Sequence, residues 1–172
     1  MSIKKIVVIG PESTGKSTLS EALAAALATV WVPEFARGYL EALGRPYEQK
    51  DLLTIARGQL AAEDQLMGLA NNYMVCDTCL RVIQVWSNHK YGTCDESILK
   101  AIKERKYDLY LLTGIDMPWT YDPLREHEAA HWRQHFYSLY QRLVAESGIP
   151  WVAINGSHDE RMMLALEAIK NL

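Results

Sequence analysis

Residues 10–18, GPESTGKST, bring glycine, lysine and hydroxyl side chains together in the spacing G-x-x-x-x-G-K-[ST]. Glycines let the backbone curl with its N–H groups pointing inward, where they can surround phosphate oxygens. Lys16 is then expected to reach the β- and γ-phosphates of ATP, and the hydroxyl of Ser17 to ligate Mg²⁺. The residues expected to hold the nucleotide phosphates are Gly10, Ser13, Thr14, Gly15, Lys16, Ser17 and Thr18.

The flanking sequence supports this interpretation of the motif. The apolar run IVVI lies directly before it and a helical pattern directly after it, so a strand, the loop and a helix should follow one another. The N-terminus of such a helix attracts anions through its dipole. A net charge of -3 provides no basic surface for nucleic acid or an anionic membrane, so neither is an expected partner, and any phosphate must be bound locally.

Carboxylates follow two other expected strands. VPEFAR, residues 32–37, offers Glu34 and Arg37 after the second strand, and Asp77 ends the third. In open α/β sheets ligands bind at the carboxyl ends of the strands, so these side chains should face the phosphate site. One carboxylate would anchor the Mg²⁺ water shell and the other would act as base toward a substrate hydroxyl. The spacing leaves open whether Glu34 or Asp77 is the base.

Residues 114–128, GIDMPWTYDPLREHE, fit neither a strand nor a helix pattern and predict a mobile lid over about residues 114–134. Trp119 and Tyr121 offer aromatic faces on which a flat, cationic substrate ring could stack. Arg125 and Arg133 could close on the transferring phosphoryl group. The alternative for both arginines is ion pairing with nearby glutamates on a helix surface.

Two further motifs suggest redox or metal chemistry instead. Cys76 and Cys79 form a C-x-x-C pair, but Cys76 lies in a buried apolar run, where cysteine behaves as a small hydrophobe. We therefore expect Asp77, rather than the thiols, to carry the chemistry of YMVCDTC. HEAAH, residues 127–131, matches the H-E-x-x-H pattern of zinc proteases. Charged neighbours and a further histidine, His135, favour a solvated helix face over a metal site.

The whole chain reads as one α/β domain, residues 1–172. Of its 172 residues 49% are apolar and 23% charged, which is typical of a globular protein. Short β-branched runs alternate with helical patterns, which predicts a parallel sheet with helices on both faces. An odd number of cysteines and a short N-terminal apolar run favour a cytoplasmic location. The expected strands are residues 3–9, 29–32, 73–76, 109–113 and 150–154.

Several segments together resemble the NadR-type nicotinamide riboside kinase domain of bacteria. In chain order they are GPESTGKST, VPEFARGYLE, IARGQ (55–59), CDTCLRVIQVWSNHKYG (76–92), YDLYLLT (107–113) and PWTYDPLR (118–125). The resemblance runs from residue 3 to about residue 165. The phosphate-binding motif alone is widespread, whereas the VWS, KYG and PW-x-x-D-x-L-R segments are far more specific. The family commonly has an acid at the place of Cys79 and often glutamate at the place of Asn88.

The resemblance implies a P-loop kinase-like, three-layer α/β/α fold with a five-stranded parallel sheet and a lid after strand 4. It implies ATP and Mg²⁺ as cofactors and a small-molecule acceptor. The sequence leaves the oligomeric state open, with a possible homo-oligomer. The implied reaction transfers the γ-phosphate of ATP to the 5′-hydroxyl of nicotinamide riboside, giving nicotinamide mononucleotide. The implied site residues are Lys16, Ser17, Glu34, Arg37, Asp77, Trp119, Asp122 and Arg125. The loop of residues 155–161 is expected to hold adenine, with Asn155 and Arg161 as its contacts.

Two alternatives stay open. The first is a kinase for a different nucleoside, and the second is a regulatory module that binds and slowly hydrolyses ATP and signals by lid movement.

Overall fold

Five parallel strands form one sheet in a computed structural model that describes residues 2–127 and 129–172. The order across the sheet is β2-β3-β1-β4-β5. The strands are β1 (Lys4–Ile9), β2 (Val30–Val32), β3 (Tyr73–Asp77), β4 (Leu109–Thr113) and β5 (Trp151–Ile154). Each expected strand is confirmed, with ends that differ by no more than one residue from those expected.

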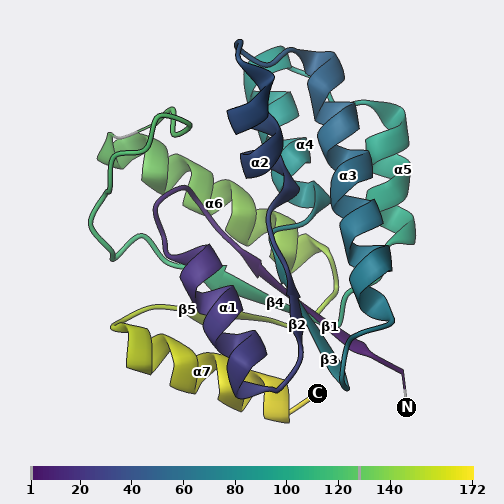
Figure 1. Ribbon diagram of the computed structural model, residues 1–172. Helices are drawn as coiled ribbons and strands as arrows, with labels where there is room; N and C mark the ends of the chain where they lie inside the picture. The colour runs from purple at the N-terminus through teal and green to yellow at the C-terminus, as the bar shows by residue number, and fades with distance from the viewer. Residues whose placement is uncertain (1, 128) are drawn as a thin grey trace.

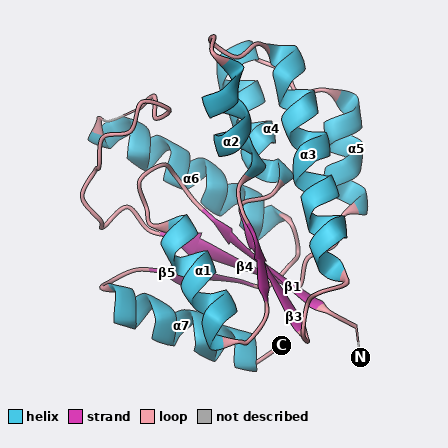
Figure 2. Ribbon diagram, viewed as in Figure 1, coloured by secondary structure: helices cyan, strands magenta, loops and turns pink. Residues whose placement is uncertain are grey.

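Seven helices belong to the described part of the chain (Figure 1). They are α1 (Lys16–Ala26), α2 (Phe35–Leu43), α3 (Gln49–Met67), α4 (Leu80–Tyr91), α5 (Glu96–Glu104), α6 (Ala130–Glu146) and α7 (His158–Lys170). Figure 2 shows them on both sides of the sheet, as expected for α/β proteins. The segment 114–129, which joins β4 to α6, contains neither helix nor strand among its described residues.

The alternation of side chains along the strands divides the core into two layers. On β1, Ile6 and Val8 pack with residues of α1 and α7, such as Leu19 and Ile169. Val7 and Ile9 point to the opposite face, where α3, α4 and α6 contribute side chains. A third cluster joins α2 and α5 to α3 and α4 at one end of the molecule. Because strands buried on both faces have few polar residues, β1 and β4 appear in the sequence as continuous apolar runs.

Gly10 allows the two central strand ends to approach each other. A Cβ atom at Gly10 would lie 2.3 Å from Thr113 Oγ1 and 2.8 Å from the Thr113 carbonyl oxygen, and its φ of +154° also favours glycine. Thr14 Oγ1 lies 2.7 Å from Thr113 Oγ1 and donates to the carbonyl of Pro11 at 2.8 Å. The glycine-rich loop is therefore fixed to the end of β4 as well as to β1.

Gly58 on α3 supports the start of α2. A Cβ atom on Gly58 would lie 2.2–2.5 Å from ring atoms of Phe35, so the ring packs directly on the helix backbone. Phe35 follows Glu34, and its backbone N–H donates to Gln59 Oε1 at 2.9 Å. These two neighbouring residues of α3 therefore determine where Glu34 is held.

We predict that Gly58→Ala lowers the free energy of unfolding by about 1–3 kcal/mol, because the added methyl group overpacks the contact with Phe35. Gly38→Ala on α2 is the matched control. No atom lies within 4 Å of a Cβ atom at Gly38, so alanine should raise the free energy of unfolding by about 0.5–1 kcal/mol. Urea unfolding of both variants measures the difference, and equal effects would contradict the packing argument.

Candidate active site

The loop between β1 and α1 has the geometry of a phosphate cradle. Gly15 adopts a left-handed conformation, with φ of 75°, directly before the first turn of α1. Lys16 is half-buried, and its Nζ donates to the carbonyl oxygen of Pro11 at 2.7 Å, so the lysine folds over the loop. The cradle, the helix N-terminus and the cation therefore occupy one place, as the motif predicts.

Asp77 and Ser17 meet beside this loop. Ser17 Oγ donates to Asp77 Oδ2 at 2.5 Å, whereas Asp77 Oδ1 is buried without a hydrogen-bond partner among the described residues. Burial raises the pKa of Asp77, while the hydrogen bond from Ser17 and the charge of Lys16 lower it. Thr78 turns the chain sharply here, with a φ of +70° that is unfavourable for a β-branched residue. The structure thus brings together the two residues expected to hold magnesium.

Glu34 follows β2, which lies next to β3 in the sheet and on the same side of β1 as Asp77. It precedes α2, and it lines a cavity that also reaches Lys16. Burial raises the pKa of Glu34, and so does the nearby charge of Asp77, whereas Lys16 and Arg37 lower it. A carboxylate with a raised pKa is suited to accept a proton near neutral pH.

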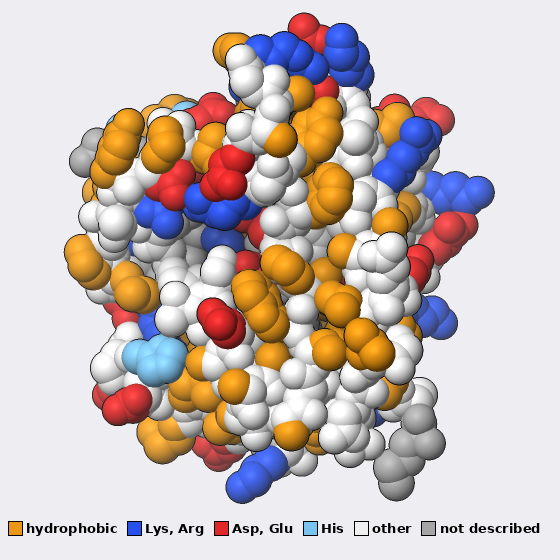
Figure 3. All heavy atoms as spheres, viewed as in Figure 1, with side chains coloured by type: hydrophobic (Ala, Val, Ile, Leu, Met, Phe, Trp, Pro, Cys, Tyr) orange, Lys and Arg blue, Asp and Glu red, His pale blue; other side chains and the backbone are white. Residues whose placement is uncertain are grey.

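The cavity extends from the glycine-rich loop into the space between α2, α3, α4 and α6, with a volume of about 240 Å³. Figure 3 shows a hollow on this side of the molecule, with basic and acidic side chains gathered at its edge. Its inner wall is mainly apolar and aromatic. The residues of this wall are Leu40, Tyr47, Leu52, Ile55, Val82, Ile83, Trp86 and Tyr140.

Several lining residues were not predicted from the sequence as site residues. Trp86 occurs in the VWS segment that marks the family resemblance, but nothing in the spacing assigned it to the site. Tyr47 and Tyr140 come from segments without a motif, and Gln59 ends IARGQ, another segment of the resemblance. Glu12 lies inside the phosphate-binding motif at one of its variable positions. These residues converge only in the folded chain, because they come from five separate segments.

The described residues of the segment 114–129 dock on the glycine-rich loop. Ser13 Oγ accepts from the backbone N–H of Thr120 at 2.9 Å and from Arg125 Nη1 at 3.3 Å. Arg133 Nη2 donates to the carbonyls of Ser13, at 3.2 Å, and Met117, at 2.9 Å. Both lid arginines therefore contact the phosphate loop, as expected for residues that close on it. Of the two, Arg125 lines the cavity.

The other residues predicted in this segment lie further out. Tyr121 is 83% exposed, and the ring of Trp119 lies against the guanidinium of Arg125, with 5.8 Å between the guanidinium carbon and the ring centroid. Asp122 Oδ2 accepts from Arg37 Nη2 at 2.8 Å, which ties the segment to α2. Among the described residues that line the cavity, the aromatic faces come from Tyr47, Trp86 and Tyr140 rather than from this segment.

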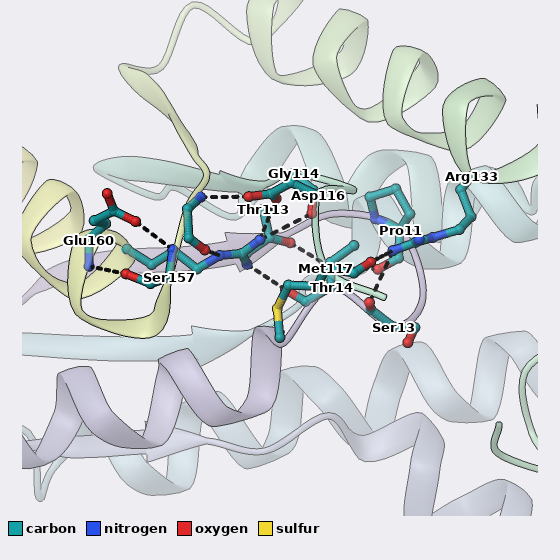
Figure 4. A network of polar contacts seen from close by, with 12 residues as sticks. Pro11, Ser13, Thr14, Thr113, Gly114, Asp116, Met117, Arg133, Ser157 and Glu160 are labelled. Carbon is teal, nitrogen blue, oxygen red and sulfur yellow. Dashed lines mark hydrogen bonds and ion pairs between the residues drawn. The ribbon is translucent and has the colours of Figure 1, made fainter. Parts of the chain in front are cut away.

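Arg161, predicted to contact adenine, joins three parts of the fold. It is 3% exposed, and its guanidinium donates to the carbonyl of Thr14 at 2.7 Å and to Asp116 Oδ1 at 2.6 Å. Figure 4 shows the surrounding network, which links Thr14, Gly114 and Asp116 to the capping box of α7. Asn155 is exposed, and its Oδ1 lies against Gly114. The structure thus gives Arg161 a supporting position beneath the loop.

The competing motifs take other roles. All three cysteines are buried, and burial raises the pKa of Cys79 to about 12, which disfavours the thiolate that redox or metal chemistry requires. In HEAAH, Glu128 lies outside the described residues. The expectation of a solvated helix face is wrong for His127, which precedes α6 and stacks on Trp86 at 5.7 Å between ring centroids. It holds for His131 and His135, which are exposed.

Within 2–127 and 129–172, no group of three or more histidine, cysteine or acidic side chains has an arrangement that could hold a metal ion. In the same part of the chain, no helix combines the length and apolar character needed to cross a membrane.

Comparison with known proteins places the chain near NadR proteins. A protein-family profile described as "AAA domain" matches residues 5–161. The trifunctional NAD biosynthesis/regulator proteins NadR of Salmonella typhimurium and Escherichia coli are each 25% identical over 177 residues, which cover 99% of this chain and 43% of the relative. The chain therefore spans less than half the length of these relatives. The resemblance inferred from the sequence motifs is confirmed.

Solved structures of NadR proteins share the fold. One, described as a complex with NR, is 23% identical with a TM-score of 0.82, and the match covers 98% of this chain and 49% of that one. Another, described as a complex with NAD and AMP-PNP, is 24% identical with a TM-score of 0.76 and the same coverage. The expected fold, a P-loop kinase-like parallel sheet between helices, is therefore confirmed.

We predict that Glu34→Gln stabilises the protein increasingly as the pH rises. Because burial raises the pKa of Glu34, its stabilising contribution is fully present below the ordinary value of 4.5 and is lost as the pH rises through the folded-state pKa. Glutamine lacks this titration, so the gain in free energy of unfolding over the wild type should grow as the pH rises from 4.5 to neutrality and above. Urea unfolding across this range measures it. The control is Glu21→Gln on the exposed side of α1, and an equal gain there would contradict the assignment.

We predict that Arg161→Met lowers the free energy of unfolding by about 3 kcal/mol, because it leaves the partners of a buried guanidinium unpaired. Arg142→Met on the exposed surface of α6 is the matched control and should change stability little. Thermal unfolding of both variants provides the measurement. A wild-type melting temperature for Arg161→Met, with a raised KM for ATP, would assign Arg161 to the nucleotide instead.

Proposed function

The chain belongs to the AAA domain family, and from that premise we propose that it is an ATP-dependent kinase that phosphorylates the 5′-hydroxyl of nicotinamide riboside, giving nicotinamide mononucleotide. The observation that carries the proposal is the position of Glu34. It lines the cavity that runs from the phosphate loop to an aromatic pocket, so an alcohol bound in the pocket would meet a carboxylate next to the nucleotide.

The two carboxylates have different surroundings, which supports different roles. Glu34 faces the cavity, and its raised pKa suits proton transfer. Asp77 instead accepts the hydroxyl of Ser17 and keeps a buried oxygen without a partner among the described residues. We assign the base to Glu34 and the magnesium site to Asp77 with Ser17.

The reaction then follows from these positions. Glu34 accepts the proton of the acceptor hydroxyl, whose oxygen bonds to the γ-phosphorus of ATP while the bond to the β,γ-bridging oxygen breaks and ADP leaves. Lys16 and the N–H groups of the loop hold the phosphate oxygens. Arg125, which lines the cavity from the lid side, stabilises the charge on the migrating phosphoryl group. The docked segment 114–129 excludes water from this step.

Magnesium fits the donors that the chain offers. A serine hydroxyl and a carboxylate are oxygen ligands of the type Mg²⁺ prefers, and Oδ1 of Asp77, which has no hydrogen-bond partner among the described residues, could accept from water on the metal. When bound, Mg²⁺ neutralises charge on the β- and γ-phosphates.

The pocket suits a cationic, flat ring. Tyr47, Trp86 and Tyr140 offer aromatic faces, and Glu12 and Glu126 add carboxylates to the lining. Of the two positions that depart from the family pattern, Cys79 lines the cavity, whereas Asn88 is exposed on α4. The negative charge that a pyridinium ring requires therefore comes from residues other than these two. NadR proteins, one of them described in complex with NR, support this choice of substrate.

A regulatory ATPase remains the alternative from another class. The contacts of the segment 114–129 with Ser13 and Glu12 favour it, because a change at the phosphate loop would pass directly to the lid. Such a module needs no acceptor, so the two functions differ in whether ADP release depends on a nucleoside.

We predict that nicotinamide riboside accelerates ADP release, measured by coupled assay, and that mass spectrometry finds its 5′-phosphate. Glu34→Gln should lower the transfer rate by roughly 10²–10⁴-fold while calorimetry still detects ATP binding, because the variant loses only the proton acceptor. Lys16→Ala should abolish both transfer and hydrolysis.

The kinase proposal fails if no riboside in a panel accelerates ADP release above the rate with ATP alone. An active wild type with unchanged transfer in Glu34→Gln would instead reject Glu34 as the base, and Asp77→Asn would then be the next variant to test.

A further inference from the structure

We propose that Gln59 determines specificity for the acceptor by donating a hydrogen bond from its Nε2 to a lone pair of the substrate. The inference rests on the proposed kinase function and adds a chemical requirement to it. The acceptor must present an oxygen or nitrogen lone pair, and not a hydrogen-bond donor, to this point of the cavity.

The orientation of the Gln59 amide is fixed by its neighbour. Gln59 lies on α3 with 2% of its surface exposed, and its Oε1 accepts from the backbone N–H of Phe35 at 2.9 Å. An N–H group can only donate, so the oxygen must face Phe35 and the NH₂ group must face away from it. The side chain therefore presents only donors to its remaining surroundings.

These donors have no hydrogen-bond partner among the described residues. Nε2 of Gln59 is buried and makes no hydrogen bond to any described residue, although Gln59 lines the cavity. Buried polar groups are nearly always hydrogen-bonded, since an unpaired one destabilises the folded protein. The neighbouring wall, from Leu52, Ile55 and Ile83, is apolar. A ligand that accepts from Nε2 would remove this cost.

The location of Gln59 makes such a ligand the acceptor substrate. The N–H group that binds Gln59 belongs to Phe35, the residue next to Glu34, and Gln59 and Glu34 both line the same cavity. An alcohol that reaches Glu34 must extend the rest of its structure into the pocket that Gln59 lines. Nucleosides offer two kinds of lone pair there, from hydroxyls of the sugar and from a carbonyl on the ring.

Two substitutions separate the hydrogen bond to the substrate from the one to Phe35. Gln59→Glu keeps an oxygen that can accept from the Phe35 N–H but loses the NH₂ donor, whereas Gln59→Met removes both groups at similar size. Gln65→Met, on the exposed side of the same helix, is the matched control. Circular dichroism melting of each variant separates loss of fold from loss of recognition.

The experiment measures kcat/KM for nicotinamide riboside, and for the pyridine riboside that lacks the carboxamide, with each protein. Gln59→Glu and Gln59→Met should each lose roughly 10- to 100-fold in kcat/KM for nicotinamide riboside, mainly through KM for the riboside. Gln65→Met should match the wild type. If the bond goes to the ring carbonyl, Gln59→Met should no longer distinguish the two ribosides; if it goes to the sugar, both ribosides should lose equally.

Two results would overturn the inference while leaving the kinase intact. Values of kcat/KM within twofold of the wild type in both variants would show that Nε2 makes no bond to the acceptor. A loss confined to Gln59→Met would show that Gln59 acts only as acceptor for Phe35. If neither variant folds, the wild type alone still tests the inference. Equal kcat/KM for nicotinamide riboside and for ribosides that lack either the ring carbonyl or a sugar hydroxyl would contradict it. If the wild type is inactive with every riboside, the kinase proposal itself is wrong, and this inference is wrong with it.

Discussion

The close approach of β1, β3 and β4 at their carboxyl ends is the constraint on which the site depends. Asp77 pairs in register with Val8, so the third strand ends beside the glycine-rich loop, and Gly10 contacts Thr113 on the other side. A side chain at Gly10 would clash with Thr113. A shift of the β1–β3 register by one residue would turn Asp77 to the opposite face of the sheet. The chemistry is thus positioned by strand register, and the helices fix what the strands bring together.

This arrangement concentrates carboxylates in a poorly hydrated place. Burial raises the pKa of Glu12, Glu34 and Asp77, and the half-buried Lys16 is the cation that lowers all three. Buried carboxylates lower the free energy of unfolding, and proteins retain them where they serve binding or proton transfer. We therefore expect these three residues to reduce the stability of the protein. The left-handed backbone of Thr78 is another cost to folding that serves the site. It turns the chain so that Asp77 faces Ser17 while Cys79 lines the cavity.

The sequence predicts the phosphate side of the site well and the pocket poorly, for physical reasons. Lys16, Ser17 and Asp77 were predictable because a local motif and the ends of strands determine their positions. Trp86 and Tyr47 were not, since a residue on a helix faces a cavity only through the packing of that helix against others, and no local pattern encodes it. Trp119 and Tyr121 were assigned to stacking from their residue type alone, and the structure places neither of them among the residues that line the cavity; Tyr121 is 83% exposed.

In the proposed kinase, the docked segment would also link recognition of ATP to recognition of the acceptor. Glu12 Oε2 accepts from the backbone N–H groups of Glu126 and His127, at 3.3 and 3.4 Å, while Arg37 holds Asp122 from α2. Glu12 belongs to the phosphate loop and Arg37 to the helix that follows the proposed base, and both line the cavity. A lid that bonds to both sides closes best when each side is correctly placed. Binding at the phosphate loop or in the pocket would therefore favour closure of the segment over the other site. In this way a kinase can limit transfer of phosphate to water before the acceptor binds.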